Sequence, residues 1–375
     1  DLISIVIFYC LVILFYFKNK SKFEVQGGII FLYRTQIGLK LMDRIAKAIP
    51  RFWKVLAYPI ITVGFAGMFY ILFWITVGVF KQVFFGGTPP LAPVLPGVSI
   101  PGLPNLSFWH WIIAIFAVVV VHEFMHGVYA RVENLKVKSS GFGFFGPIPL
   151  AFVEPDEKEM VKRNKKGQLA ILAAGAFTNV VFALLFLFIF SLVTTPLYNS
   201  AFDKEGIKVE QVNANSPARD LDLPFVITQI NGEQTSNAQQ FANVTSTLEI
   251  NQTITLTTDK GELIVTTISN PKNDSRPYIG IECLSQNYVK KESTSSFGGK
   301  LISWLWLLSF WLFVVNLGVG LFNLLPLGPV DGGKMFYTLM LAIFKNNEKI
   351  ASKVWGFVSW YCVLLIIIGL FPYLI

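Results

Sequence analysis

Six long apolar segments constrain the fold of this chain more than any other feature of its sequence. Hydrophobic residues make up 53% of the 375 residues and charged residues only 14%. Runs of about 20 apolar residues are long enough for helices that cross a bilayer, and soluble domains rarely have such a composition. We therefore predict an α-helical polytopic membrane protein with about six transmembrane helices. The apolar segments are Leu2 to Phe17, Val55 to Phe80, Trp111 to Ala130, Leu169 to Leu192, Leu301 to Leu325 and Val354 to Ile375.

The loops between these segments alternate in their content of Lys and Arg, which predicts the orientation in the membrane. The first, third and last loops are basic, whereas the second carries Lys81 alone. The positive-inside rule places the basic loops in the cytosol and both termini on the other side. This bias also accounts for the net charge of +8. Because the cations lie beside apolar segments and form no folded basic domain, we expect no nucleic-acid partner.

Two loops have distinctive patterns of their own. In the first, the stretch from Gly28 to Lys54 mixes apolar residues with regularly spaced cations. This pattern fits an amphipathic helix that lies among lipid headgroups, and equally one that packs against the rest of the protein. The second loop, Gly86 to Phe108, is rich in Pro and Gly, so we expect neither regular helix nor central strand there.

The third apolar segment contains an H-E-x-x-H sequence, His122-Glu123-Phe124-Met125-His126. Two histidines four residues apart on a helix lie on one face about 6 Å apart, a spacing that suits a tetrahedral metal ion. The glutamate between them can act as a base in metal-assisted hydrolysis. His122 lies about 14 Å along the helix from Arg131 and about 17 Å from Trp111. The site is therefore expected inside the membrane, nearer the cytosol, where ionisable residues are costly and usually functional.

A metal ion held by two histidines needs at least a third protein ligand. The remaining histidine, His110, lies about three turns from His122 on the same predicted helix, too far to share the ion. We therefore expect a carboxylate from another segment, and Asp331 is the only acidic residue between positions 293 and 346. It follows an apolar segment that is broken by prolines and glycines. Such a break is tolerated at membrane depth where it lines a cavity, but it also fits a helix end at the surface with a solvated Asp331.

These motifs together resemble those of the site-2 protease family of intramembrane metalloproteases, in which an H-E-x-x-H helix meets an N-x-x-P…D-G helix. The second motif reads Asn323-Leu324-Leu325-Pro326 and then Val330-Asp331-Gly332, with Val330 where the family commonly has Leu. The stretch Gly141 to Glu154 resembles the family's membrane-associated β-hairpin. Ala173 to Asn179 resembles its A-G-P-x-x-N helix, with Ala176 in place of Pro. The resemblance implies one Zn²⁺ ion held by His122, His126 and Asp331, with Glu123 as the general base.

Two intramembrane asparagines and the hairpin are further candidates for the site. Asn179 could donate a hydrogen bond to a substrate carbonyl or oxyanion, or bond a neighbouring helix. Asn323 has the same two options, and we assign a catalytic role to Asn179 and a supporting, substrate-binding role to Asn323. Gly141, Gly143 and Pro147 are expected to bind substrate, because the hairpin could present an open strand edge to an unwound peptide. A loop that only plugs the cytosolic side is the alternative.

The stretch from Thr194 to Gly298 alone has a soluble composition. Short β-type runs at 207–212, 225–230, 253–258 and 263–268 are separated by turn signals, and a helix is expected at 237–248. This stretch resembles a PDZ domain through Val209-Glu210-Gln211-Val212, Ser216-Pro217-Ala218 and Ile227 to Gly232, although Asp222-Leu223 stands where Gly-Leu is usual. The resemblance implies a small α+β domain, extracytosolic by the charge rule, that could contact peptides or substrate ectodomains.

The sequence thus predicts three regions: a membrane region at 1–193, a PDZ-like domain at 194–298 and a second membrane region at 299–375. We expect a zinc-dependent metalloendopeptidase that cleaves membrane-protein substrates within or near their transmembrane segments, as in regulated intramembrane proteolysis. Another membrane zinc peptidase, such as a prenyl-protein endopeptidase, would share H-E-x-x-H but usually takes its third ligand from a downstream Glu. A non-catalytic membrane scaffold that recruits partners through the PDZ-like domain is the remaining alternative.

Overall fold

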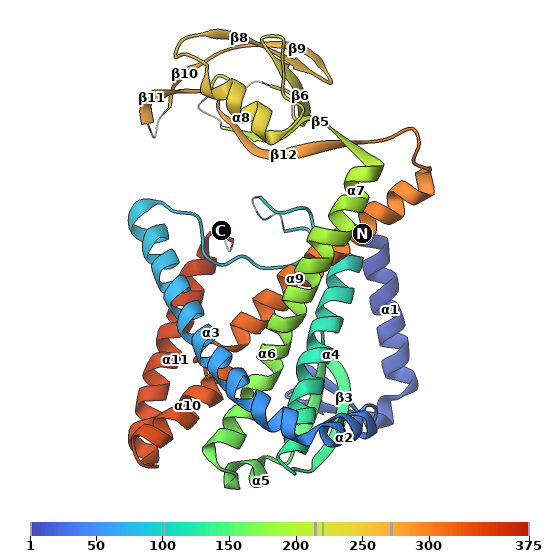
Figure 1. Cartoon of the computed structure of the whole chain (residues 1–375), viewed down its shortest axis with the longest axis vertical. Coiled ribbons are helices and arrows are strands. Elements are labelled where there is room, and N and C mark those ends of the chain that lie inside the picture. Colours follow the sequence, from blue (N-terminus) through green and yellow to red (C-terminus); the bar gives the residue numbers. More distant parts are fainter. Residues whose placement is uncertain are drawn as a thin grey trace. The chain divides into compact units, whose positions relative to one another are not determined.

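The computed structural model describes residues 2–98, 100, 102–213, 216–219, 221–270 and 273–373. The chain divides into two compact units. The first comprises Asp1–Val98, Asn105–Phe190 and Leu307–Ile375, and the second comprises Ser99–Pro104 and Ser191–Trp306. The first unit is mainly helical with one small sheet, and the second is mainly β-structure (Figure 1).

Five helical stretches among the described residues are long and apolar enough to cross a bilayer. The first predicted segment is shorter, since helix α1 (Leu2–Lys18) has 17 residues where a span needs about 20. A multi-pass membrane protein is therefore the fold class, and the sixth span remains a prediction. The five stretches are α3 (Pro50–Phe85), α4 (Phe108–Val132), α6 (Lys165–Ile189) with its continuation to Ala201, α9 (Ser296–Asn323), and α11 (Glu348–Leu370) with its continuation to Tyr373.

A four-stranded antiparallel sheet accompanies these helices. Its strand order is β1 (Phe23–Gln26), β2 (Ile30–Thr35), β3 (Val137–Phe145) and β4 (Ile148–Pro155). Strands β3 and β4 form the hairpin that was predicted at 141–154, and the pairing of β2 with β3 joins it to an N-terminal hairpin. Among the described strands, β4 pairs with β3 alone, so the other edge of β4 is open.

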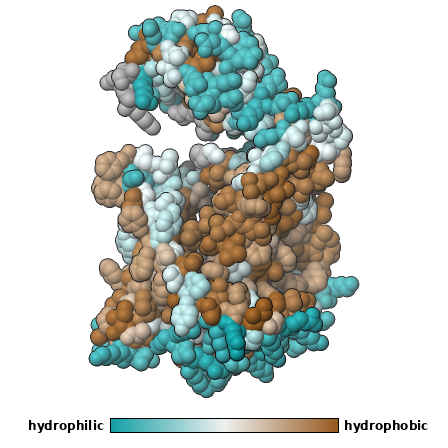
Figure 2. Space-filling view, in the orientation of Figure 1, coloured by the Kyte–Doolittle hydropathy of each residue, from teal (hydrophilic) through white to brown (hydrophobic). Residues whose placement is uncertain are grey.

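The expectation of an amphipathic helix from Gly28 to Lys54 is wrong for its first part. Ile30–Thr35 is strand β2, which pairs with β1 and β3, and helix α2 covers only Leu39–Ala48. Leu39, Met42 and Ala46 on α2 are buried in the core of the helical unit. Helix α2 therefore packs against the helical unit, and its position among lipid headgroups remains a prediction. Hydrophilic side chains gather at the end of the helical unit where α2 and the short helix α5 (Glu157–Lys162) lie, below a broad hydrophobic band (Figure 2).

Stretches rich in proline and glycine interrupt the helices as predicted. The described residues between α3 and α4 form neither helix nor strand. Helix α9 ends at Asn323 and helix α10 (Asp331–Ile343) begins at Asp331. In the turn between them, the amide of Leu327 donates to the carbonyl of Leu325 at 2.7 Å, and the amide of Val330 donates to the carbonyl of Leu327 at 3.2 Å. The break therefore places a carboxylate at the start of a new helix.

Helices α4 and α6 pack closely because small residues line their contact. Ala170, Ala173 and Ala174 on α6 are fully buried, in the same core cluster as Val128 and Ala130 on α4. Small side chains let two helix backbones approach each other, which is a common means of association in membranes. This packing brings α6 against the H-E-x-x-H face of α4.

The second unit is a small antiparallel β-structure with a helix, α8 (Ala238–Ser246). Its core alternates along the strands, with Val209, Ile227 and Ile254 buried. The β-runs and the helix that the sequence predicted lie where they were expected, with ends that differ by a few residues. Strands β12 (Ile281–Lys290), β5 (Phe202–Val212), β6 (Phe225–Ile230), β8 (Thr253–Thr258) and β9 (Gly261–Thr266) follow one another in one sheet, β7 (Glu233–Gln234) pairs with β6, and β10 (Ile268–Asn270) pairs with β11 (Asn273–Tyr278).

Candidate metal centre

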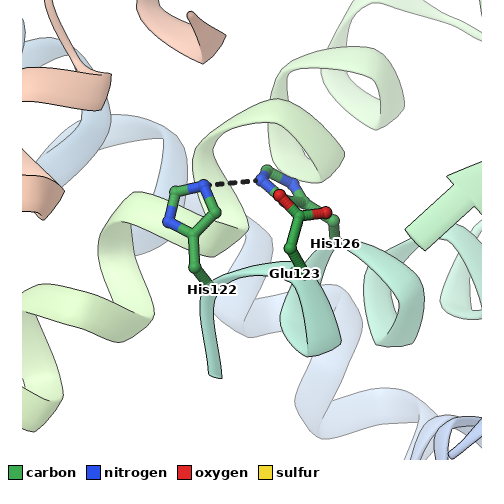
Figure 3. A group of neighbouring side chains, drawn as sticks. All are labelled: His122, Glu123 and His126. Atoms are coloured by element: carbon green, nitrogen blue, oxygen red, sulfur yellow. Dashed lines mark hydrogen bonds between the residues drawn. The ribbon is translucent and has the colours of Figure 1, made fainter. Parts of the chain in front are cut away.

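Three side chains from two distant segments converge inside the helical unit. Nε2 of His122 lies 3.1 Å from Nε2 of His126. Oδ2 of Asp331 lies 3.0 Å from the nitrogen of His122 and 3.1 Å from that of His126. The two imidazoles project from α4 toward each other, with Glu123 beside them (Figure 3). The structure therefore brings together the three residues that the sequence predicted as ligands.

The ring orientation of His126 is fixed by helix α6. Nδ1 of His126 lies 2.7 Å from the carbonyl oxygen of Ile171, and the contact is buried. A carbonyl oxygen can only accept, so Nδ1 carries the hydrogen and donates it. Nε2 of neutral His126 is consequently a lone-pair atom, and it points at Nε2 of His122 and at the Asp331 carboxylate. This is the tautomer that a metal-binding histidine needs.

Asn179, which also lies on α6, contacts the other predicted ligand, His122. The amide of Asn179 lies 3.0 Å from Nδ1 of His122, and its side chain is completely buried. A half-turn of the amide presents either Nδ2 or Oδ1 to the ring, and Oδ1 has no other hydrogen-bond partner among the described residues. With Oδ1 against the ring, Nδ1 of His122 donates and Nε2 keeps its lone pair. Asn179 thus contacts a predicted ligand, and it does not line the cavity described below.

Gly175 provides the space in which the two imidazoles meet. A Cβ atom at this position would collide with Nε2 of both His122 and His126. Gly175 is fully enclosed in α6, on the helical turn between Ile171 and Asn179. In the sequence motif Ala173 to Asn179, the asparagine was predicted to matter and the glycine was missed. Only a residue without a Cβ leaves room for both imidazoles at position 175.

The three donor atoms suit a zinc ion. Zn²⁺ bonds nitrogen and oxygen at about 2.0 to 2.1 Å, so tetrahedral ligands lie about 3.3 Å apart. The three separations of 3.0 to 3.1 Å are close to this value. Two imidazole lone pairs and a carboxylate oxygen would repel one another at this distance unless a cation or a proton lay between them. The donor set therefore fits the metal that the sequence motif predicts.

Glu123 lies on the same turn but is anchored elsewhere. The main-chain amide of Val153 donates to Oε2 of Glu123 at 3.1 Å. Glu123, His122 and His126 each offer a ligand atom, and these atoms lie within 4.8 Å of one another. Because Val153 belongs to β4, the open edge of the sheet faces this carboxylate. The amide of Val153 gives no sequence signal, since any residue except proline would supply it.

A cavity of about 330 Å³ opens beside these side chains. It is lined by His122, Glu123, His126 and Asp331, and also by Asn323, which the sequence predicted to support the site.

Glu157 on α5 and Lys334 on α10 also line this cavity, and their charged atoms lie 3.8 Å apart. Both are well exposed, so the cavity has a charged mouth. Neither residue was singled out from the sequence, where each is one of many surface charges.

The hairpin residues lie differently from the expectation. Gly141 and Gly143 belong to β3, which is paired on both sides, so the open edge is not theirs but that of β4. A Cβ at either glycine would collide with the main chain of β2, which explains the small residues. Pro147 lies in the turn, where its carbonyl accepts a hydrogen bond from the Tyr9 hydroxyl at 2.7 Å. Contact of these three residues with substrate remains a prediction.

Charged side chains join β2 to β4 across β3. Arg34 on β2 donates to both carboxylate oxygens of Glu154 on β4, at 2.7 and 3.1 Å. Ser139 also donates to Glu154. The Arg34 guanidinium is the main reason that the pKa of Glu154 lies below its usual value. Glu154 therefore stays ionised at neutral pH on β4, the strand that faces Glu123.

Comparison with known proteins decides the family. The model of peptidase family M50 matches residues 110–370, which include all the side chains of the metal centre. The chain belongs to peptidase family M50. This is the site-2 protease family, so the protein is a membrane metallopeptidase by descent.

Other proteins are similar either to most of this M50 peptidase or to a smaller part of it. An uncharacterized protein of Methanocaldococcus jannaschii is 25% identical over 353 residues, which is 92% of this chain and 86% of the relative. Among solved structures, the PDZ domain of the SdrC-like protein of Listeria innocua covers 22% of this chain and 94% of its own, at 20% identity and a TM-score of 0.19. The corresponding domain of Listeria monocytogenes covers 20% and 85%, at 24% identity and a TM-score of 0.19.

Proposed function

We propose that this M50 peptidase is a zinc-dependent endopeptidase that hydrolyses peptide bonds within or near the transmembrane segments of other membrane proteins. One observation carries the proposal, namely the convergence of His122, His126 and Asp331 within 3.0 to 3.1 Å between helices of a membrane unit. A scaffold would not need three lone-pair donors aimed at one point. The carboxylate ligand from α10, in place of a downstream glutamate, disfavours a prenyl-protein endopeptidase.

His122, His126 and Asp331 would hold the zinc ion, which when bound supplies a Lewis acid that polarises the scissile carbonyl. Glu123 is the general base. Its Oε2 atom is held by the amide of Val153, which leaves Oε1 free to take a proton from the attacking water and return it to the leaving amine. Water reaches Glu123 through the cavity whose mouth carries Glu157 and Lys334.

Asn179 acts through His122 in this proposal. With its amide turned so that Oδ1 replaces Nδ2 against the ring, Asn179 accepts from Nδ1 of His122 and so keeps Nε2 free for the ion. The earlier assignment of Asn179 to the substrate oxyanion is less well supported, because the side chain is fully buried against the ring. Asn323, which lines the cavity, is better placed to meet substrate.

The substrate is proposed to be a single transmembrane segment that unwinds locally. A transmembrane helix hides its own peptide bonds, so cleavage requires an extended stretch. The open edge of β4 lies beside Glu123 and can pair with such a stretch by strand addition. The second unit is proposed to be a PDZ-like, extracytosolic domain that contacts substrate ectodomains, which its strand pattern and the distribution of Lys and Arg support.

Cleavage of model substrates tests the proposal. Purified protein in liposomes is incubated with a panel of single-span substrates, with and without a zinc chelator, and the cut sites are mapped by mass spectrometry. We expect cuts inside or within a few residues of the span that vanish with chelator and with Glu123→Gln. A prenyl-protein endopeptidase would instead cut only a prenylated C-terminus. Fully folded protein that binds no zinc and cuts no substrate would favour a scaffold.

A further inference from the structure

A second cavity, of about 460 Å³, lies away from the metal centre, at the point where α2 ends, α3 begins and α4 ends. Its charged lining consists of four cations and one carboxylate. The residues are Lys47, Lys54, Arg131, Lys136 and Asp43. They come from four separate parts of the chain, α2, α3, α4 and the segment that leads to β3, so the fold assembles this group of charges.

The single carboxylate is already neutralised. Nε of Arg131 lies 2.9 Å from Oδ1 of Asp43, and Nη1 of Arg131 lies 3.4 Å from the carbonyl oxygen of Leu135. For the ammonium groups of Lys47, Lys54 and Lys136, no carboxylate partner occurs within the described part of the chain. Three like charges that share one cavity repel one another, and a bound anion would relieve that repulsion.

Exposed apolar side chains lie close in the sequence to Pro50, which lines the cavity. Ile49, between α2 and α3, is 59% exposed, and Phe52 in the first turn of α3 is 50% exposed. Helices α3 and α4 are both candidate spans by length and composition, so the cavity lies where two candidate spans start and end. A ligand in the cavity would therefore sit at headgroup level, with apolar side chains beside it for acyl chains.

We propose that this cavity binds a phosphate group, and that the phosphate belongs to the headgroup of an anionic phospholipid. The guanidinium of Arg131 is engaged by Asp43, so the three lysines supply the attraction as point charges. A bias of positive charge toward one side of the membrane explains why lysines lie at this edge, but it does not require three of them to line one cavity. Arg131 follows His126 by five residues on α4, so a bound lipid would brace the end of the helix that carries the metal ligands.

The test compares lipid retention by wild type and three variants of the 375-residue chain. Native mass spectrometry counts the phosphatidylglycerol molecules that remain bound after purification in a neutral detergent. The triple variant Lys47→Gln, Lys54→Gln, Lys136→Gln is expected to retain at least fivefold less of this lipid than wild type. A matched control, Lys158→Gln, Lys349→Gln, Lys353→Gln, removes the same charge from residues that do not line the cavity and should retain lipid normally.

A third variant, Lys47→Arg, Lys54→Arg, Lys136→Arg, keeps the three positive charges and is expected to retain the lipid. It separates loss of charge from any loss of folding in the glutamine variant. Binding of inorganic phosphate is measured in parallel. Loss of lipid in the glutamine variant alone supports a lipid headgroup. If wild type retains no lipid, and the glutamine variant loses the inorganic phosphate binding that wild type shows, the site takes phosphate from solution and the lipid assignment is wrong. Equal lipid retention and equal phosphate binding in wild type and the glutamine variant would overturn the proposal.

Discussion

Nε2 of His126 lies 3.1 Å from Oδ2 of Asp331, although 205 positions separate the two residues in the sequence. The helix break before α10 makes this contact, because it turns the first residue of a new helix toward α4.

We predict that Asp331→Ala lowers the zinc content of the purified protein well below one ion per chain, since a tetrahedral site would lose one of three protein ligands. Atomic absorption measures this. Asp156→Asn, at the start of α5, is the matched control and should keep its zinc, whereas stoichiometric zinc in Asp331→Ala would remove Asp331 from the ligand set.

Glu123 is predicted to be necessary for cleavage but not for metal binding. Glu123→Gln keeps the shape of the side chain and loses the basic carboxylate, so the rate should fall by about 10² to 10⁴-fold, the usual contribution of a general base. Zinc content should stay at the wild-type level. Both are measured on one preparation, beside Glu133→Gln just past the end of α4. If Glu123→Gln cut at the wild-type rate, proton transfer would have to be assigned elsewhere.

Gly175 is predicted to be a steric requirement of the metal centre. In Gly175→Ala the new methyl group would overlap Nε2 of both histidines, so the imidazoles would have to move apart. We expect weaker zinc binding, seen as faster loss of zinc to a competing chelator. Gly318→Ala on α9 is the control, because nothing lies within 4 Å of a Cβ there. Equal rates of zinc loss in the two variants would contradict the steric argument.

The sequence predicted the parts of the site that depend on local spacing. His122 and His126 follow from the helical repeat, and Asp331 follows from the scarcity of other ligands together with the broken helix. The hydrogen bonds from Val153 and to Ile171 could not be predicted, because main-chain groups are the same for every residue and only the packing of α4 on β4 and α6 brings them close.

The strand order of the four-stranded sheet could not be predicted from local sequence either. The hairpin at 141–154 was predicted from its resemblance to the family's membrane-associated hairpin, but the addition of β1 and β2 needs a contact across more than 100 residues. An apolar run such as Ile29 to Phe31 fits either a strand or a helix until its partner is known. The central place of β3, and with it the open edge of β4, follows from that pairing alone.

Asn179 is predicted to position His122 by accepting a hydrogen bond. Asn179→Ala should weaken zinc binding by about 10 to 100-fold, which is typical when the outer partner of a ligating histidine is lost. Asn179→Asp keeps an acceptor oxygen and should retain zinc close to the wild-type affinity. Zinc titration with a competing chelator distinguishes them, with Asn316→Ala, another buried asparagine, as the control. Normal zinc affinity in Asn179→Ala, with slower cleavage, would return Asn179 to a role at the substrate.

The ion pair of Arg34 and Glu154 is predicted to make the stability of the sheet depend on pH. The pKa of Glu154 is lowered in the folded protein, mainly by the hydrogen bonds from Arg34. The pair therefore stabilises the fold above the unfolded pKa of about 4.3, and this contribution is lost as pH falls through the lower folded value. Both side chains are about one-third exposed, so the effect is modest, on the order of 0.2 to 1 kcal/mol. Thermal unfolding in detergent, followed by tryptophan fluorescence, should show Glu154→Gln less stable than wild type at pH 7, with the gap narrowing as pH falls below about 4. The gap should be smaller at pH 7 when Arg34→Gln is already present, and a gap that does not change with pH or with Arg34→Gln would contradict the pairing.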